Sequence, residues 1–290
     1  MDITLDFAQE NYPLAPTSLY NVGGLARVAL MPQTREEVEA SYDWAKTQDL
    51  PMIVLGGGSN VLIADNGFPG IVLFTTELVG IEDLGENRYW VGGGTILDTM
   101  VNETTLKHNY HGAGGLTGTP GSVGGAIFMN AGTINGSICE LMESVDITTS
   151  SGTQTIPITS ELYSYRGQSF CPPSGLILGG TFQFEFSEED QQAKYEHYIN
   201  RRKKTQPKGH SCGSVFKNPE GDHSGRLIEA CGLKGTRRGG AAISDVHANF
   251  IVNDQNATSA DILALIQLCK ETVYMEHGVQ LEEEVKIYGI

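Results

Sequence analysis

Gly118-Thr119-Pro120-Gly121-Ser122-Val123-Gly124-Gly125-Ala126 is the most informative segment of this 290-residue chain. Glycine backbone can turn sharply and present successive N–H groups to an anion. The small and apolar residues that follow, up to residue 132, predict that the segment opens a short helix. The first N–H groups of such a helix would be free to bind a phosphate. A purely structural role, as tight turns in a β-rich domain, is the alternative.

A second glycine segment, Gly56-Gly57-Gly58-Ser59-Asn60, directly follows an apolar strand expected at residues 52–55. Alone it fits a flexible turn equally well, and it is not the dinucleotide fingerprint because Val61 occupies the last glycine position. Two such loops in one domain, however, fit a dinucleotide whose pyrophosphate binds to both. The candidate cofactor-binding residues are Gly56, Gly57, Gly58, Ser59, Asn60, Gly118, Pro120, Gly121, Ser122, Gly124 and Gly125.

Composition excludes several classes of protein. The chain has 19 Lys and Arg against 35 Asp and Glu, and this net charge of −16 disfavours broad binding to nucleic acid or anionic lipid. No apolar run is long enough to span a membrane, and residues 1–30 lack the pattern of a secretory signal. The five cysteines are scattered without a C-x-x-C pair. We therefore expect no disulfide framework, no metal site and a reducing, cytoplasmic location.

The order of expected elements indicates a mixed α and β chain in two parts. In the first part we expect a helix at residues 36–47, a hairpin turn at Ser151-Gly152, and a helix at residues 187–205 with Ser187 as its N-cap. A Gln-Pro-Lys-Gly sequence at residues 206–209 follows this helix, so the domain boundary is expected near residue 205.

The second part is predicted to contain a short helix at residues 225–230 and a long helix that begins at a capping box, residues 258–261, and ends at Gly278. The buried face of the long helix is expected to carry Ile262, Leu265, Ile266, Cys269 and Val273. The last segment, residues 279–288, alternates like a half-buried strand. Glu282 and Glu284 lie on its polar face, whereas Glu283 lies on its apolar face.

Basic residues concentrate between Arg201 and Arg238, where ten Lys or Arg stand against three acids. The region contains a further turn, Gly213-Ser214-Val215-Phe216-Lys217-Asn218-Pro219. Cations gathered around such a turn predict a pocket for a small polyanionic ligand. A solvated basic face is the alternative, particularly at residues 201–204, whose charges also suit the C-terminal end of a helix. Nucleic acid is a weaker candidate, because no aromatic cluster accompanies these charges.

In order and spacing, these segments resemble the UDP-N-acetylenolpyruvoylglucosamine reductase (MurB) family of flavoenzymes nearly end to end. The resemblance rests on residues 18–24 with Ala26, residues 55–60 with Asp65 and Gly67, residues 119–126 with 129–132, Tyr165-Arg166, residues 213–219, Ser244 with residues 247–250 and Asn253, and residues 281–285. The chain departs from the family pattern at Gly114, where a glutamate is frequent, and at Gln168, where a serine is usual. It resembles the shorter members, which lack an extra tyrosine-bearing segment.

The resemblance implies an α+β fold. It places a two-part FAD-binding region of the PCMH/vanillyl-alcohol-oxidase type in residues 1–205, with subdomains of about 1–76 and 77–205. A smaller α/β substrate-binding domain follows in residues 206–290, and its terminal strand, 279–288, is expected to return to the FAD region. The implied enzyme is a cytoplasmic, monomeric FAD-dependent oxidoreductase. It uses NADPH to reduce UDP-N-acetylglucosamine enolpyruvate to UDP-N-acetylmuramate in peptidoglycan precursor synthesis.

The catalytic residues of the family correspond to Arg166, Ser214 and Glu284. A guanidinium suits the enolate charge that hydride addition creates on the substrate carboxylate, and Arg166 is the only Lys or Arg between Lys107 and Lys194. A serine after a glycine turn can present its hydroxyl as a proton donor, although it needs a positive field from a group such as Lys217. Surface, turn-forming and solvated-edge roles are the alternatives. The substrate-binding candidates are Lys217, Asn218 and Arg202.

Two other functions stay open on the residues alone. Another flavin oxidase or dehydrogenase would share the glycine-rich loops but would not need the turn at residues 213–219 beside basic residues. A sugar-nucleotide-binding protein without chemistry would share the basic pocket, but it would not need all three catalytic residue types.

Overall fold

The computed structural model describes residues 5–290, which divide into two compact units. Unit 1 comprises Met1–Asn11, Arg27–Gly57 and Gly70–Arg201, and unit 2 comprises Tyr12–Ala26, Gly58–Pro69 and Arg202–Ile290. The division falls inside the helix that precedes residue 206. Two segments from the first quarter of the chain belong to unit 2, a feature that the sequence analysis did not anticipate.

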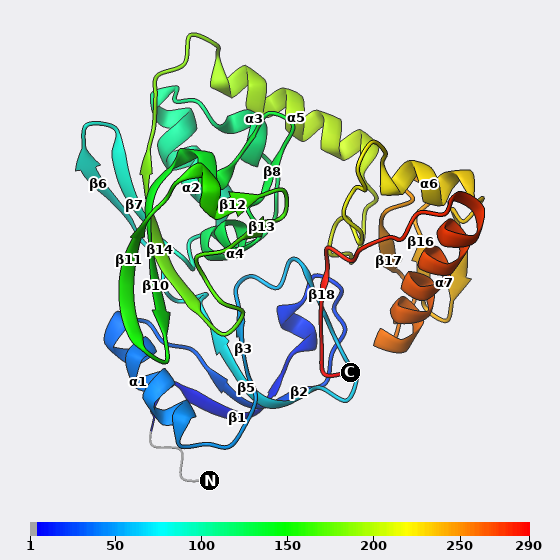
Figure 1. Ribbon diagram of the computed structural model, residues 1–290, viewed down its shortest axis with the longest axis horizontal. Coiled ribbons are helices and arrows are strands. Elements are labelled where there is room, and N and C mark those ends of the chain that lie inside the picture. Colours follow the sequence, from blue (N-terminus) through cyan, green and yellow to red (C-terminus); the bar gives the residue numbers. More distant parts are fainter. Residues whose placement is uncertain (1–4) are drawn as a thin grey trace. The chain divides into compact units, whose positions relative to one another are not determined.

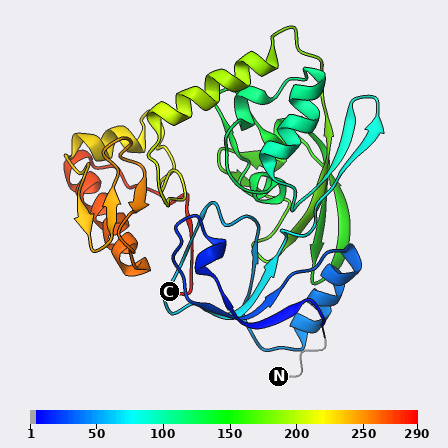
Figure 2. The ribbon, with the colours of Figure 1, turned by 180° about the vertical axis from the view of Figure 1, so that it is seen from behind.

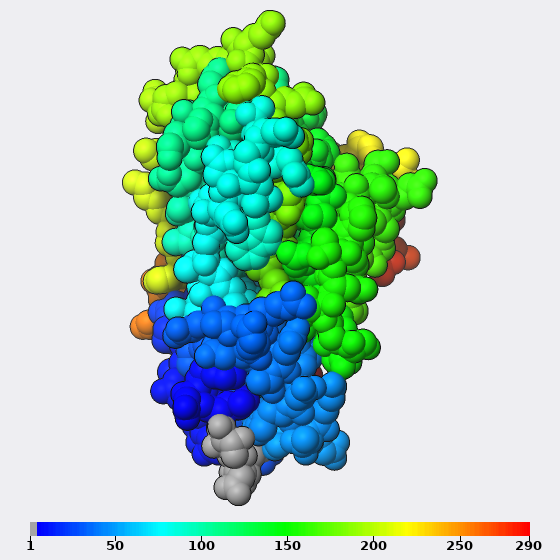
Figure 3. Space-filling model, turned by 90° about the vertical axis from the view of Figure 1, so that its left-hand side faces the viewer, coloured from blue at the N-terminus to red at the C-terminus, as the bar shows by residue number. Residues whose placement is uncertain are grey.

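Unit 1 contains a five-stranded antiparallel sheet in the order β11-β10-β14-β7-β6 (Figure 1). Its strands are β6 (Ile81–Gly85), β7 (Arg88–Gly92), β10 (Met142–Thr149), β11 (Gly152–Pro157) and β14 (Leu176–Gln183). The turn between β10 and β11 confirms the hairpin predicted at Ser151-Gly152. Figure 3 shows the side of unit 1 on which the cyan β6–β7 segment and the green β10–β11 segment reach the surface.

A second sheet, in the order β1-β2-β5-β3, contains β1 (Ala8–Pro13), β2 (Leu25–Leu30), β3 (Met52–Leu55) and β5 (Phe68–Phe74). Strands β3 and β5 are parallel neighbours, so their carboxyl ends lie at the same edge. The predicted first helix is confirmed as α1 (Arg35–Lys46), which Thr34 caps. Val38 and Tyr42 of α1 are buried in one apolar cluster with residues of β2, β5 and β14.

The remaining regular elements of unit 1 are short, apart from α5 (Gln191–Thr205). They are α2 (Leu97–Met100), η2 (Val101–Leu106), α3 (Ala113–Leu116), α4 (Val123–Phe128), β8 (Gly132–Thr133), β9 (Gly136–Ser137), η3 (Ile138–Leu141), η4 (Ser160–Leu162), β12 (Tyr163–Ser164) and β13 (Gly167–Gln168). Residues of α2, α4 and η3 pack into the apolar core beside the five-stranded sheet.

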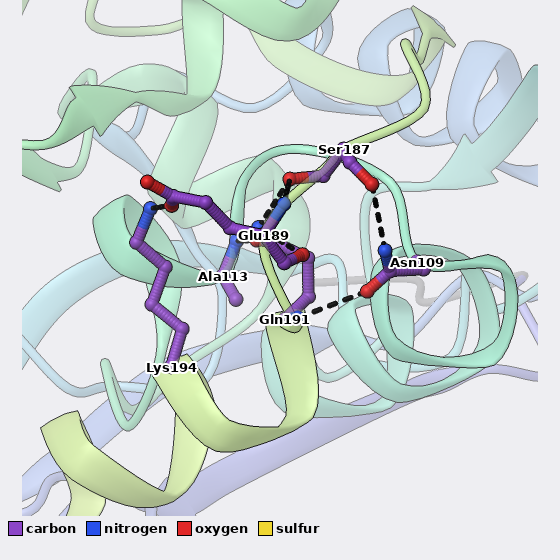
Figure 4. A network of polar contacts seen from close by, with 6 residues as sticks. All are labelled: Asn109, Ala113, Ser187, Glu189, Gln191 and Lys194. Atoms are coloured by element: carbon purple, nitrogen blue, oxygen red, sulfur yellow. Dashed lines mark hydrogen bonds and ion pairs between the residues drawn. The ribbon is translucent and has the colours of Figure 1, made fainter.

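Helix α5 begins at Gln191, so the prediction that Ser187 caps it is wrong. The N–H of Ser187 donates to the carbonyl of Asn109 at 2.9 Å, and the Asn109 amide donates to the carbonyl of Ser187 at 2.8 Å (Figure 4). These bonds hold residue 187 outside the helix. Asp190 caps it instead, because its carboxylate accepts the N–H of Ala193 at 3.0 Å.

Unit 2 is built around α7 (Ser259–His277), which lies against the orange strands in Figure 2. The capping box and the left-handed Gly278 are confirmed, and the five apolar residues predicted for its inner face are all buried. The other elements of unit 2 are η1 (Ala15–Thr17), β4 (Val61–Ile63), α6 (Ser224–Ala230), β15 (Arg237–Arg238), β16 (Ala241–Ile243), β17 (Ile251–Asn253) and β18 (Lys286–Tyr288).

The predicted continuous strand at residues 279–288 is wrong, because its partner changes midway. Residues 282–284 bond to residues 215–217, whereas residues 286–288 pair in parallel with β4. Two successive N–H groups, of Glu284 and Val285, donate to the carbonyl of Val215, and this β-bulge interrupts the alternation of side chains.

None of the described helices combines the length and apolar character needed to cross a bilayer. Within residues 5–290, no three His, Cys, Asp or Glu side chains are grouped as metal ligands. All five cysteines are free thiols.

Candidate active site

The two glycine segments meet in unit 1. A Cβ atom added to Gly56 would lie 2.4 Å from Oγ of Ser122, and one added to Gly57 would lie 3.2 Å from Cα of Gly121. A side chain at Gly56 would displace the Ser122 hydroxyl, and one at Gly57 would require the two loops to separate by a few tenths of an ångström. The structure thus brings together two loops that the sequence analysis singled out separately.

The N–H groups at the start of α4 are already hydrogen-bonded, contrary to the prediction. Ser122 is the N-cap, and its hydroxyl accepts the N–H of Gly125 at 3.3 Å. The first two N–H groups of the helix donate to carbonyl oxygens within residues 93–95, each at 2.8 Å. The expectation that these groups are free for a phosphate is therefore wrong, because a neighbouring segment already binds them.

Free donors lie just before the helix. Among the described residues, none accepts a hydrogen bond from the N–H groups of Gly56, Gly57, Gly121 or Ser122. The buried hydroxyl of Thr75 also has no partner in this part of the chain, and its Oγ1 lies 3.6 Å from the Cβ position of Gly56. Unpaired donors around glycine backbone fit the pyrophosphate of FAD.

Thr75 is not among the residues predicted from the sequence. It directly follows β5, and its N–H donates to the carbonyl of Leu55 at the end of the parallel neighbour β3. The available signal was a hydroxyl residue at the carboxyl end of a strand beside a glycine loop, which is where ligands bind in parallel sheets.

The second half of the first glycine loop belongs to unit 2. Gly58 has a φ of 62°, and a Cβ atom there would lie 1.6 Å from the carbonyl oxygen of Thr17, so only glycine fits. The side-chain nitrogen of Asn60 donates to the carbonyl of Glu284 at 3.0 Å, and the main-chain carbonyl of Asn60 accepts the N–H of Lys286 at 3.0 Å. A predicted cofactor residue thus bonds to the segment that carries a predicted catalytic acid.

Arg166 lies in unit 1, in the two-residue turn of the hairpin formed by β12 and β13. Its φ of 56° is unusual for a long side chain, and such strain is commonly found at functional positions. The guanidinium donates to the carbonyl of Gly132 at 3.1 Å and lies 5.2 Å from the centre of the Tyr165 ring. Asn130 donates to the carbonyl of Ser164 at 2.9 Å and so fixes the same hairpin.

Ser214 and Glu284 are brought together in unit 2. The segment that follows Ser214 runs antiparallel to residues 282–285, and the N–H of Glu284 donates to the carbonyl of Val215 at 2.8 Å. Ser214 follows Gly213, whose φ is 75°, and its hydroxyl makes no hydrogen bond to any other residue from 5 to 290. Glu283 forms an ion pair with Lys270 of α7 at 2.6 Å, whereas the main chain of Glu284 is bonded to the segment that follows Ser214.

The three substrate-binding candidates have distinct surroundings. Lys217 forms an ion pair with the exposed Glu282, so its charge is already compensated. The side-chain oxygen of Asn218 accepts the N–H of Ser224 at 3.2 Å, and this bond holds the start of α6. Arg202 is half-buried in the last turns of α5, and Lys203 beside it is exposed.

The structure shows the surroundings of the two residues, Gln168 and Gly114, that depart from the family pattern. The Gln168 amide accepts the N–H of Cys171 at 2.7 Å and donates to its carbonyl at 2.8 Å, so it closes the loop after the Arg166 hairpin. Gly114 borders a pocket of about 190 Å³, whose polar lining includes the Gln191 and Lys194 side chains of Figure 4. The Gln191 side chain bonds to Ala113 and Ser187, and Lys194 forms an ion pair with Glu189.

His247 supplies a pH-dependent contribution to stability. Burial, followed by the charge of Lys234, lowers the pKa of His247 from its usual 6.5. The folded state therefore favours the neutral ring, whose Nδ1 accepts the N–H of Asn249 at 3.2 Å. Because the unfolded chain binds more protons, this stabilisation is present above about pH 6.5 and is lost as the pH falls through the lower folded value.

When the pH is lowered from about 7.5 to about 5, we therefore expect the melting temperature of His247→Gln to fall less than that of wild type. Thermal unfolding followed by circular dichroism measures this difference. His197→Gln, an exposed position on α5, is the control and should retain the wild-type pH dependence. The same pH dependence in His247→Gln and wild type would contradict the assignment.

Comparison with known proteins identifies the family. Residues 205–288 match the model described as UDP-N-acetylenolpyruvoylglucosamine reductase, C-terminal domain, and residues 26–156 match the model described as FAD binding domain. The chain is 37% identical over 286 residues to the UDP-N-acetylenolpyruvoylglucosamine reductase of Myxococcus xanthus, covering 96% of this chain and 91% of that one. It is 38% identical over 280 residues to that of Protochlamydia amoebophila, covering 96% and 93%.

Among solved structures, the crystal structure of UDP-N-acetylenolpyruvylglucosamine reductase (MurB) from Thermus caldophilus is similar, with a TM-score of 0.80 and 33% identity. The match covers 97% of this chain and 98% of that one, so it extends over both units. The identity to named relatives, the family models and this shared fold lead to one conclusion. The chain belongs to the UDP-N-acetylenolpyruvoylglucosamine reductase family.

Proposed function

We propose that this chain reduces UDP-N-acetylglucosamine enolpyruvate to UDP-N-acetylmuramate with NADPH as the hydride source. The reaction class, FAD-dependent oxidation and reduction, follows from the family and its FAD-binding domain. The names of the relatives support the substrate. The product is a precursor of peptidoglycan, so we also propose a role in cell wall synthesis.

The chemistry divides between the cofactor and the side chains. FAD, when bound, supplies hydride transfer from NADPH to the enolpyruvyl carbon β to the carboxylate. Arg166 pairs with the substrate carboxylate and stabilises the enolate charge that develops there. Ser214 delivers a proton to the adjacent carbon, and Glu284 is the second proton-holding group at this position.

The observation that supports these roles most directly is the main-chain pairing between the Ser214 turn and the Glu284 segment. Through this pairing the Ser214 hydroxyl lies beside the backbone of Glu284. Within residues 5–290 that hydroxyl has no hydrogen-bond partner. A hydroxyl whose hydrogen is not donated to a protein acceptor is available to donate it to the substrate. The unpaired N–H groups of Gly56, Gly57, Gly121 and Ser122 support FAD as the bound dinucleotide.

The functional ranges are part of the proposal. Residues 1–205 bind FAD, and residues 206–290 bind the UDP-sugar, with Lys217, Asn218 and Arg202 as substrate contacts. The match of residues 205–288 to a C-terminal domain model supports this division. A monomeric enzyme in the cytoplasm is proposed as well, since five free thiols suit a reducing compartment.

Ser214→Ala should separate the two half-reactions. Flavin reduction by NADPH should continue at the wild-type rate, because no proton donor to the substrate acts in that step. Reoxidation by the enolpyruvyl substrate should slow by about 10² to 10⁴, the usual loss when a positioned acid is removed. Stopped-flow absorbance measures each step, and equal losses in both would refute the role of Ser214.

Gly57→Ala should lower FAD retention. The new Cβ atom would lie 3.2 Å from the Gly121 backbone, so the loops must separate by a few tenths of an ångström. We expect a reduced ratio of flavin to protein absorbance after desalting. Gly85→Asn is the control, because nothing lies within 4 Å of its Cβ position and Asn tolerates the φ of 79°. Equal flavin content in both variants would place the pyrophosphate elsewhere.

Arg202→Ala combined with Lys203→Ala should raise the Michaelis constant for the UDP-substrate and leave the maximal rate nearly unchanged. The diphosphate is bound alike in the ground and transition states, so its loss weakens capture without affecting chemistry. Added salt should weaken wild type more than the double variant, because it screens the same charges. An unchanged Michaelis constant would mean that Arg202 and Lys203 only stabilise the C-terminal end of α5 and do not bind the diphosphate.

A further inference from the structure

Asn249 makes an unusual set of contacts with the turn that carries Ser214. It lies in the loop between β16 and β17 and is only 3% exposed. Its side-chain oxygen accepts the N–H of Phe216 at 2.9 Å, and its side-chain nitrogen donates to the carbonyl of Phe216 at 2.8 Å. Its main-chain carbonyl accepts the N–H of Val215 at 2.8 Å. All three bonds end on the two residues that directly follow Ser214.

These contacts immobilise the backbone after Ser214 from one side, and residues 282–285 bond to it from the other. The carbonyl of Val215 accepts the N–H groups of Glu284 and Val285, and the N–H of Lys217 donates to the carbonyl of Glu282. The side chains of Val215 and Phe216 are each 1% exposed. Every main-chain polar group of these two residues is therefore paired, and Asn249 supplies the partners for three of the four.

Ser214 depends on this backbone for its orientation. Its hydroxyl has no hydrogen-bond partner among residues 5–290, and the preceding Gly213 has open space at its Cβ position. Because no hydrogen bond holds the hydroxyl, the position of the main chain is the main determinant of where it points. A displacement of about 1 Å at a reacting group can reduce a rate by about 100-fold, so the Asn249 contacts bear directly on proton delivery.

We propose that Asn249 is a positioning residue for Ser214: it fixes the backbone that aims the serine hydroxyl at the substrate carbon. The inference rests on the proposed function of Ser214 as proton donor. Asn249 acts through the main chain of residues 215 and 216 and does not touch the reacting atoms.

The chain offers a matched control in Asn253. This residue is 5% exposed, and its side chain donates to the carbonyl of Tyr20 at 2.8 Å and accepts the N–H of Ala257 at 2.7 Å. Asn253→Ala removes two amide-to-backbone bonds, as Asn249→Ala does, from a similarly buried site in the same unit. Its side chain makes no bond to residues 213–217.

The experiment measures both half-reactions of wild type, Asn249→Ala, Asn249→Asp and Asn253→Ala by stopped-flow absorbance, with the solvent deuterium isotope effect on reoxidation. The Asp variant keeps the size of the side chain but turns an oxygen toward the Phe216 carbonyl, so it serves if the Ala variant fails to fold. We expect both Asn249 variants to slow reoxidation by about 10- to 100-fold and to raise the isotope effect. Flavin reduction by NADPH should stay within about twofold, because it does not use Ser214.

Asn253→Ala should lower the unfolding temperature without a change in reoxidation rate or isotope effect. The proposal is overturned if both asparagine sites slow reoxidation equally, or if the Asn249 variants lose both half-reactions together with flavin. A wild-type enzyme that is reduced by NADPH but not reoxidised by the enolpyruvyl sugar nucleotide would instead overturn the proposed function itself.

Discussion

The parallel pairing of β4 with β18 is the constraint on which the rest of unit 2 depends. It sets Lys286 opposite Val61 and Ile287 opposite Leu62, and so brings Asn60 beside Glu284. The carbonyl of Val61 also accepts the Cys212 thiol at 3.1 Å, just before the Ser214 turn. Burial raises the pKa of Cys212 to about 11, so the thiol keeps its proton and stays a donor at neutral pH. One short strand therefore organises the glycine loop, the serine turn and the acidic segment.

In unit 1 the candidate site segments are brought together by the close approach of two main chains. At Gly56 and Gly57 the absence of a side chain allows two loops to touch. The first N–H groups of α4 are paired with residues 93–95, whereas those of Gly121 and Ser122 have no acceptor among residues 5–290. The site thus depends on backbone geometry more than on particular side chains, which is consistent with 36 glycines in the chain.

Local sequence patterns predicted those elements whose causes are local. Helix α7 has its own capping box, apolar stripe and terminal glycine, and α1 has its own cap. The predictions that failed involved partners distant in the sequence. Ser187 could not be excluded as a cap without knowing that Asn109 binds it, and the strand at residues 279–288 could not be divided without knowing its two partners.

The candidate site also contains some features with local causes and others that depend on distant segments. The glycine loops and the Ser214 turn were readable from residue types and spacing, and the family resemblance supplied the roles of Ser214 and Glu284. Thr75, Asn60 and Asn249 act through contacts that only the folded chain creates. The pairing of Lys217 with Glu282 likewise depends on two segments that meet only in three dimensions.

The inclusion of residues 58–69 in unit 2 has a consequence for the synthesis of the chain. Asn60 and Glu284 are 224 positions apart, so the ribosome makes β4 long before its partner β18 exists. During that interval the apolar Val61-Leu62-Ile63 segment is an unpaired edge, which invites association with other chains. Strand β4 can pair only after residues 286–288 have left the ribosomal tunnel. The pairing of β4 is therefore a late event, and chaperone protection of this segment until then would favour the yield of folded enzyme.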